Sequence, residues 1–200
     1  MQIVLIRHAQ TPGNALRRYI GRTDEPLSRE GICAAEVAGA LPEVRQVFVT
    51  PLRRTRQTAH ILFPNAEQTV LPALREMDFG DFENRNADEM YGDAAYRAWV
   101  DGGCLGVCPN GEATTEFTAR VCEGFRTALR GIPADVRQAF FVVHGGVIMA
   151  IMSQFARPEI SYYDAWVKNC AGYVCTPAGE NDKLILTDVR RIACAAEAMA

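Results

Sequence analysis

The chain has 200 residues, 48% of them hydrophobic, and a formal net charge of −3. These values suit one α/β domain with a core of its own, and they offer no basic surface for nucleic acid or an anionic membrane. The apolar runs fall well short of the ~20 residues of a membrane span, and the N-terminus lacks the basic region of a signal peptide. We therefore expect a single domain over residues 1–200, located in the cytoplasm, with no nucleic-acid or membrane partner.

The first predicted element is a strand over residues 3–6, which ends on Arg7 and His8. The run is short, continuous and rich in Val and Ile, and such a run is typical of a strand buried on both faces. Arg7 and His8 then lie at its carboxyl end, where open α/β sheets bind their ligands. A histidine beside a permanently charged guanidinium suits chemistry on an anion.

Helical and strand patterns alternate through the rest of the first half. Ser28 is a suitable N-cap for a helix that continues to Leu41, before Pro42. After it, the apolar patterns and the proline stops predict a strand over 46–50, a helix over 51–63 and a strand over 69–74.

The second half continues the alternation. It predicts helices over 86–100, 112–130 and 145–155, and strands over 139–143, 173–176 and 184–189. Strands that alternate with helices indicate a three-layer α/β/α sandwich around a mostly parallel central sheet. The Gly-rich stretch 101–111 is either a lid or an ordinary surface loop.

Seven cysteines are spread along the chain. An odd number without an export signal favours reduced thiols over a disulfide framework. No two of them are separated by the two residues that are usual in zinc sites, so we expect no metal. Small buried hydrophobes are the expected role of Cys33, Cys122, Cys170 and Cys175.

Two of the three histidines, His8 and His144, end apolar strands. Gly145 and Gly146 follow the second and allow backbone N–H groups to approach an anion where a helix begins. Histidines in two equivalent positions favour one shared site over two structural residues. His60 lies inside a helical pattern and is expected to be a surface or packing residue.

Arginines form a second group at the start of the predicted helix 51–63. A cluster of this kind is usually a solvated helix face, which is the role expected for Arg53 and Arg56. An arginine in the first turn would instead point toward the same crevice as Arg7. Its planar guanidinium binds phosphate through two parallel hydrogen bonds.

Four motifs, in order between residues 3 and 146, resemble those of the histidine phosphatase superfamily, in its phosphoglycerate mutase-like branch 1. They are the N-terminal segment, Thr-Pro-Leu-Arg-Arg (50–54), Arg-Glu-Met-Asp-Phe-Gly (75–80) and Val-His-Gly-Gly (143–146). Two further segments, 19–21 and 24–31, resemble the small cofactor-independent phosphatases of the α-ribazole phosphatase type. The resemblance implies a phosphoglycerate mutase-like fold and no cofactor.

The resemblance also implies roles for individual residues. His8 matches the nucleophile that becomes a phosphohistidine, and Glu76 matches the general acid. The cationic pocket around the phosphoryl group is matched by Arg7, Arg54 and His144. Phosphate or substrate binding is assigned to Thr11, Asn14, Tyr19, Gly21 and Gly145.

This chemistry is coherent without a metal. A neutral imidazole is a nitrogen nucleophile, and cationic side chains take the place that Mg²⁺ has in other phosphoryl-transfer enzymes. Glu76 has to protonate the leaving alkoxide, and burial against Phe79 and Phe82 would raise its pKa for that task. The alternative for Glu76 is a surface glutamate paired with Arg75.

Two departures from the family pattern matter. Ala9 stands where the family most often has glycine, a small change beside the nucleophile. Residues 81–87 have Ala87 where phosphoglycerate mutases have a substrate-binding lysine, which favours hydrolysis. A cofactor-dependent phosphoglycerate mutase and a catalytically weak module that binds phospho-ligands remain alternatives, although the second would be expected to lose His8 or Glu76.

The expected function is thus a metal-independent phosphomonoesterase for a small phosphorylated metabolite, with α-ribazole 5′-phosphate as the named candidate. The leaving group is expected to contact Arg17, Arg18, Tyr19, Tyr162, Tyr163 and the region 81–111.

Overall fold

The computed structural model describes residues 1–41, 43–179 and 183–199. Six strands form one sheet in the order β3-β2-β4-β1-β5-β6. Strands β1 to β4 are parallel to one another, whereas β5 runs antiparallel to β1 and β6 antiparallel to β5. The mostly parallel sheet is therefore confirmed. The strands are β1 (Gln2–Arg7), β2 (Gln46–Val49), β3 (Glu67–Val70), β4 (Gln138–Val143), β5 (Gly172–Ala178) and β6 (Ile185–Ile192).

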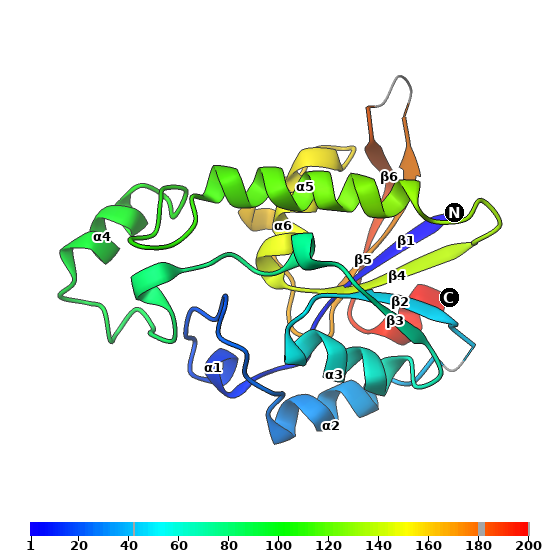
Figure 1. Cartoon of the computed structure of the whole chain (residues 1–200), viewed down its shortest axis with the longest axis horizontal. Helices are drawn as coiled ribbons and strands as arrows, with labels where there is room; N and C mark the ends of the chain where they lie inside the picture. Colours follow the sequence, from blue (N-terminus) through cyan, green and yellow to red (C-terminus); the bar gives the residue numbers. More distant parts are fainter. Residues whose placement is uncertain (42, 180–182, 200) are drawn as a thin grey trace.

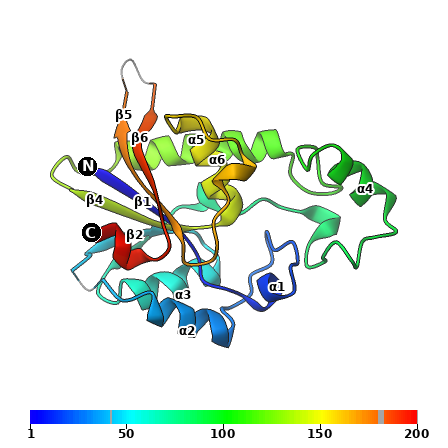
Figure 2. The ribbon, with the colours of Figure 1, turned by 180° about the vertical axis from the view of Figure 1, so that it is seen from behind.

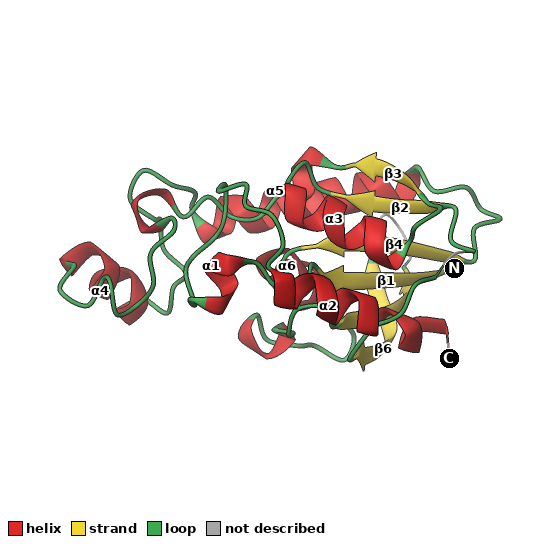
Figure 3. Ribbon diagram, turned by 90° about the horizontal axis from the view of Figure 1, so that it is seen from below, coloured by secondary structure: helices red, strands yellow, loops and turns green. Residues whose placement is uncertain are grey.

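Helices cover both faces of the sheet, as the three-layer prediction requires (Figures 1 and 3). One face carries α2 (Arg29–Val37) and α3 (Arg53–Leu62), and the other carries α5 (Thr114–Arg130) and α6 (Gly145–Phe155). Two short helices, α1 (Pro12–Ala15) and α4 (Ala94–Asp101), lie beyond the end where the parallel strands finish. Figure 2 shows both chain termini at the opposite end of the molecule.

Strand β1 explains why the N-terminal motif is held so firmly. Ile3 and Leu5 pack into the core beneath α5 and α6, and Val4 and Ile6 pack into the core beneath α2 and α3. All four side chains are completely buried, and each is worth about 1.5–3 kcal/mol relative to an exposed side chain. This anchoring fixes the carboxyl end of β1 relative to the sheet.

Three predicted elements were wrong in extent, two of them in the segments 69–74 and 86–100. The strand over 69–74 ends at Val70, because Pro72 has no N–H for the ladder and opens the 3₁₀ turn η1 (Pro72–Leu74) instead. The helix over 86–100 begins only at Ala94, where the Asp93 side chain accepts hydrogen bonds from two backbone amides. Residues 86–92 form turns.

The predictions for the cap of α2 and for the cysteines were confirmed in part. Ser28 caps α2 as predicted by accepting a hydrogen bond from the Gly31 amide. The helix ends at Val37 and not at Leu41, because Gly39 adopts a φ of +86° just after it. Pro42 lies outside the described residues. Cys33 is exposed on α2 and is not the buried hydrophobe that was expected. The structure leaves all seven cysteines as free thiols and buries Cys122, Cys170 and Cys175.

The stretch 101–111 is tied down rather than free-standing. The Asp81 amide donates a hydrogen bond of 2.9 Å to the Pro109 carbonyl, and the Asn110 side chain donates to the Asp81 carboxylate. Gly80 allows this approach: it has a φ of +54°, and an added Cβ would lie 2.0 Å from the Pro109 oxygen. In this structure the stretch forms part of the wall at the carboxyl end of the sheet.

Candidate active site

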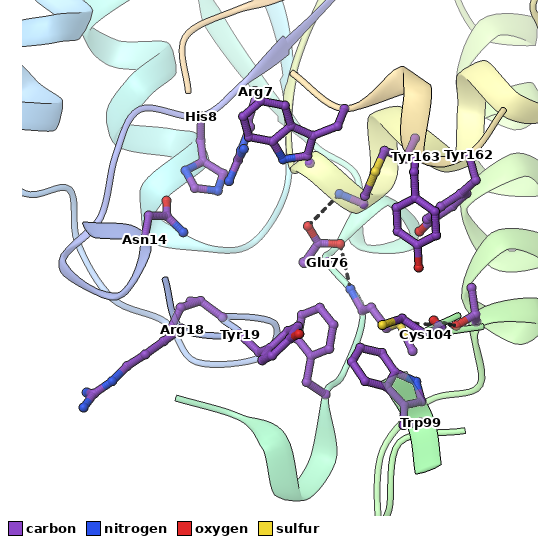
Figure 4. Close-up of a pocket in the computed structure, with 18 residues that line it drawn as sticks. Arg7, His8, Asn14, Arg18, Tyr19, Glu76, Trp99, Cys104, Tyr162 and Tyr163 are labelled. Carbon is purple, nitrogen blue, oxygen red and sulfur yellow. Dashed lines mark hydrogen bonds between the residues drawn. The ribbon is translucent and has the colours of Figure 1, made fainter. Parts of the chain in front are cut away.

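A cavity of about 310 Å³ opens at the carboxyl ends of β1 and β4 (Figure 4). Residues singled out from the sequence that line it are Arg7, His8, Asn14, Tyr19, Glu76 and Gly145. Those that lie outside the cavity wall are Thr11, Gly21, Arg54 and His144. The structure therefore brings the predicted nucleophile and the predicted acid to one cavity. Of the predicted cationic pocket, Arg54 and His144 lie outside the wall of this cavity.

The His8 imidazole is held in one orientation. Its Nδ1 lies 2.7 Å from the Ala9 carbonyl oxygen, and because a carbonyl only accepts, Nδ1 carries the proton. No hydrogen bond among the described residues engages Nε2. Burial lowers the pKa of His8 well below 6.5, and the charges of Arg54 and Arg7 lower it further. A neutral ring with a free Nε2 lone pair is the form that attacks an electrophile.

Arg7 offers a positive charge to the cavity from the end of β1. Its Nη1 donates to the Val167 carbonyl at 2.8 Å, and its guanidinium lies 5.7 Å from the ring centre of Trp166. Its buried Nε has no partner among the described residues. Gly145, the first residue of α6, lies next to the Arg7 guanidinium. A guanidinium and a helix N-terminus are therefore neighbours here, and this arrangement suits the binding of an oxyanion.

Glu76 lies across the cavity from His8 (Figure 4). Its two carboxyl oxygens accept hydrogen bonds of 3.0 Å from the amides of Met77 and Gly146. Although these bonds favour the ionised form, burial raises the pKa of Glu76 above its ordinary value. No ion pair with Arg75 is present among the described residues, and a carboxyl group with a raised pKa suits a general acid.

The predicted packing around Glu76 is only half right. Phe79 lines the same cavity. Phe82 is instead buried in the core beside Tyr96 and Trp99, with ring centres 5.4 and 5.5 Å away. Burial of Glu76 therefore comes from the cavity wall and not from Phe82.

Arg54 is completely buried behind His8. Its guanidinium donates to the carbonyls of Thr23 and Gly21 at 2.8 and 2.9 Å, and its Nε donates to Nδ1 of His144 at 3.3 Å. Because Arg54 remains charged at this depth, it acts on His8 through its electrostatic field, which lowers the pKa of that imidazole.

His144 is the N-cap residue of α6 and is also completely buried. Its Nδ1 accepts from Arg54, so Nε2 carries the proton and donates to the Thr50 hydroxyl at 2.9 Å. The ring centres of His144 and His8 are 5.2 Å apart. Burial lowers the pKa of His144 well below 6.5. In this structure, His144 therefore packs against the His8 ring from outside the cavity wall.

Thr11 and Gly21 build the loops around the cavity. The Thr11 hydroxyl accepts from the Asn14 amide at 3.2 Å, and the Asn14 side-chain oxygen accepts from the Thr11 amide at 3.3 Å, which together cap α1. The Gly21 amide donates to the Glu83 carboxylate at 3.0 Å. Neither residue lines the cavity, and their phosphate-binding roles stay predictions.

Glu83, the other acidic candidate near the Arg-Glu motif, makes its hydrogen bonds outside the cavity. Its carboxylate accepts hydrogen bonds from the amides of Gly21, Arg22 and Phe79 and from the Thr23 hydroxyl. This residue holds the 21–23 loop in place and does not line the cavity.

The remaining wall of the cavity is largely aromatic and apolar. It includes Tyr19, Phe79, Trp99, Met149, Tyr162, Tyr163 and Trp166. Arg18 lies at one end and pairs with Glu89, whereas Arg17 does not line the cavity. Cys104 joins the wall from the stretch 101–111, where the Tyr163 hydroxyl donates to the Gly103 carbonyl at 2.8 Å.

One group of site residues was missed by sequence reasoning. Trp166, Val167 and Asn169 contact the N-terminal motif from a segment that is about 160 positions away in the chain. Nothing in the local pattern of that segment indicates such contacts, since none of the four motifs includes it.

The described part of the chain gathers no group of three or more His, Cys, Asp or Glu side chains that could hold a metal ion. No helix in that part has the length and apolar character needed to cross a membrane.

The fold and this constellation define a histidine phosphatase. The chain belongs to the histidine phosphatase superfamily (branch 1), whose family model matches residues 3–188. Among its relatives is the adenosylcobalamin/alpha-ribazole phosphatase of Salmonella typhimurium, which is 33% identical over 161 residues, or 77% of this chain and 79% of the relative. The probable phosphoglycerate mutase GpmB of Enterobacter sp. is 32% identical over 180 residues, or 86% of this chain and 82% of that protein.

Solved structures show the same fold. The alpha-ribazole phosphatase of Shigella flexneri superposes with a TM-score of 0.78 at 24% identity and covers 93% of this chain and 94% of its own. TTHB049 of Thermus thermophilus gives a TM-score of 0.69 at 29% identity and covers 96% and 99% of the two chains. The predicted phosphoglycerate mutase-like fold is thereby confirmed.

Proposed function

We propose that this protein is a phosphomonoesterase that works through a phosphohistidine on His8. The observation that carries the proposal is the neutral His8 imidazole, whose Nε2 is free in a cavity shared with the Arg7 guanidinium and the Glu76 carboxyl group. Nucleophile, charge-stabilising group and proton donor are the three parts that phosphoryl transfer without a metal needs.

The reaction follows from these positions in two steps. In the first, Nε2 of His8 attacks phosphorus, the ester P–O bond breaks, and Glu76 gives its proton to the leaving oxygen. In the second, Glu76 takes a proton from water, the resulting hydroxide attacks phosphorus, and the P–N bond breaks. Inorganic phosphate leaves and His8 is restored. Arg7 and the side-chain amide of Asn14 hold the non-bridging oxygens. The buried positive charge of Arg54 adds to the electrostatic field that acts on His8 and the phosphoryl group.

The cavity wall favours a leaving group with a planar apolar part. Trp99 and the Tyr162 and Tyr163 rings lie on the side of Glu76 that is remote from His8 (Figure 4), and Tyr19 and Phe79 also line the cavity. A benzimidazole nucleoside fits this environment, since aromatic rings pack favourably on one another. Together with the names of the Salmonella relatives, this supports α-ribazole 5′-phosphate as the substrate.

The second candidate is a phosphoglycerate mutase, which the name of the Enterobacter relative favours. A glycerate carboxylate needs a cation near the leaving group. Besides Arg7, Arg18 is the cation that lines the described cavity, and it already pairs with Glu89. Position 87, where mutases of the family have lysine, is Ala87. These features make hydrolysis the better supported reaction.

A phosphomonoester panel tests the proposal. The panel includes α-ribazole 5′-phosphate and is run with excess EDTA, with inorganic phosphate as the measured product. A parallel reaction contains 3-phosphoglycerate and catalytic 2,3-bisphosphoglycerate. We expect phosphate release that survives the chelator. Rapid formation of 2-phosphoglycerate without phosphate release would assign the protein to the mutases instead, and activity that needs added Mg²⁺ would contradict the metal-free mechanism.

A further inference from the structure

The segment 166–171, which connects η3 (Tyr163–Ala165) with β5, is attached to the end of β1 by several hydrogen bonds. The Cys170 amide donates to the Arg7 carbonyl at 3.0 Å, and the Arg7 amide donates to the Ala171 carbonyl at 2.9 Å. The Arg7 side chain in turn donates to Val167. This segment therefore supports the cavity although it belongs to none of the family motifs.

Asn169 makes the most informative contacts of this segment. Its Nδ2 donates to the His8 carbonyl at 2.8 Å and to Oδ1 of Asn14 at 3.2 Å. One amide nitrogen thus connects the backbone of the nucleophile with the side chain of a residue on the cavity wall. Asn169 itself does not line the cavity, so any effect on bound phosphate has to pass through its neighbours.

The contact with Asn14 decides which end of that side chain faces the cavity. Oδ1 of Asn14 accepts from two donors, the Thr11 amide at 3.3 Å and Nδ2 of Asn169. Since an amide oxygen accepts and an amide nitrogen donates, the NH₂ end of Asn14 is the one that remains for a ligand. Figure 4 shows Asn14 beside His8 on the cavity wall. Rotation of the amide by 180° would present an oxygen to the phosphate, which repels it.

We propose that Asn169 is a positioning residue that fixes the Asn14 amide as a hydrogen-bond donor to the phosphoryl group. This inference rests on the proposed function, because it assumes that phosphate binds beside His8. Without Asn169, only the long hydrogen bond from Thr11 opposes the wrong amide orientation.

A double-mutant cycle tests the proposal, with Asn14→Ala, Asn169→Ala and the double variant. The primary readout is the dissociation constant of inorganic phosphate, measured by titration calorimetry on the full chain. Because hydrogen bonds to charged groups are the strong ones, we expect Asn169→Ala to weaken phosphate binding about tenfold. If Asn169 acts through Asn14, the double variant binds phosphate no more weakly than Asn14→Ala does. Additive losses, or unchanged binding by Asn169→Ala, would overturn the proposal.

A second variant and a control separate orientation from simple loss of stability. Asn169→Asp keeps the size but sets a carboxylate against Oδ1 of Asn14, so we expect it to weaken phosphate binding more than alanine does. If Asn169→Ala fails to fold, phosphate binding by Asn169→Asp provides the test instead. Asn86→Ala removes another asparagine contact to the N-terminal segment, the 3.0 Å bond to the Leu16 carbonyl, and should leave phosphate binding unchanged. Equal phosphate affinity in wild type and Asn169→Asp would overturn the proposal.

Hydrolysis by the wild-type protein distinguishes the two levels of inference. If the wild type binds phosphate but hydrolyses no phosphomonoester, the proposed function fails while the cycle in phosphate affinity still tests Asn169. If the wild type hydrolyses substrate and the cycle is additive, only the role of Asn169 fails. For an active enzyme we also expect Asn169→Ala to raise KM more than it lowers kcat, since the oriented donor already acts on the bound ground state.

Discussion

Gly146 and Glu76 are in such close contact that a side chain at position 146 would fit only if the Glu76 carboxyl group moved. The Gly146 amide donates to one carboxyl oxygen at 3.0 Å, and an added Cβ would lie 2.4 Å from the other. Gly146 belongs to the His-Gly-Gly motif after β4, whereas Glu76 belongs to the Arg-Glu motif after η1. Two motifs that are 70 positions apart therefore set the place of one carboxyl group.

Gly146→Ala is expected to displace the Glu76 carboxyl group from the cavity while the fold is retained, because alanine is a good residue in the first turn of α6. Loss of the positioned acid should lower kcat for an alkyl phosphate by about 10²-fold. Gly92→Ala is the matched control, since an added Cβ there meets nothing within 4 Å. Steady-state kinetics on both variants make the measurement, and equal activities would show that the Gly146 contact has no catalytic consequence.

His8→Ala should abolish the covalent intermediate. We expect brief incubation of the wild type with a labelled phosphomonoester, quenched without acid, to leave one acid-labile phosphate per chain, as a phosphohistidine would. The His8 variant should carry no label. His60→Ala is the control, because His60 is exposed on α3 and away from the cavity. Label that persists in His8→Ala would place the nucleophile elsewhere.

Glu76→Gln should affect substrates according to their leaving groups. An alkoxide needs a proton as it leaves, so phosphoenzyme formation from an alkyl phosphate should slow by about 10²–10⁴. p-Nitrophenolate leaves without a proton, and the same step should suffer much less with p-nitrophenyl phosphate. Burst kinetics isolate this step from the later hydrolysis, in which Glu76 acts as a base.

The comparison variant for this experiment is Glu83→Gln. Its carboxylate serves the amides of the 21–23 loop, so the substitution should lower the free energy of unfolding by about 1–2 kcal/mol without distinguishing between leaving groups. A strong leaving-group dependence in Glu83→Gln alone would transfer the acid role to that residue.

The lowered pKa of His8 and the raised pKa of Glu76 predict the pH profile of phosphoenzyme formation. His8 attacks only when neutral, and its pKa is lowered, so the rate should fall on the acidic side only at a pH well below 6.5. Glu76 donates only when protonated, and its pKa is raised above 4.5, so the rate should also fall as the pH rises past that raised value. Glu76→Gln should remove the alkaline limb and keep the acidic one. Rapid-quench measurements across pH check both limbs.

The parts of the structure that the sequence predicted well are those that local patterns control. The apolar run at 3–6 has the pattern of a buried strand, and Ser28 indicates a helix start. The stretch 86–100 misled because Asn86 and Glu89 form the reciprocal hydrogen bonds of a helix start, but the turns that follow end at Gly92 and the helix begins only after Asp93.

For the candidate site, motifs identified His8 and Glu76 but not how the supporting groups are arranged. Whether the Arg54 guanidinium faces a ligand or the carbonyls of Thr23 and Gly21 depends on how a distant loop packs. The contacts of Asn169 depend on a turn far along the chain. Neither the Arg54 contacts nor the Asn169 contacts follow from a sequence spacing, so a single sequence cannot predict them.

Strand β1 leaves the ribosome well before both of its sheet partners, because β4 and β5 lie in the last third of these 200 residues. During synthesis its apolar side chains therefore have no place in the sheet until about 130 further residues have followed, and closing a loop of that length is slow. A nascent or truncated chain that ends before β5 exposes an aggregation-prone segment and carries His8 on an unanchored strand. His8 is therefore made early but reaches its place in the cavity late, so under the proposed function the order of synthesis delays catalysis until β5 has been added.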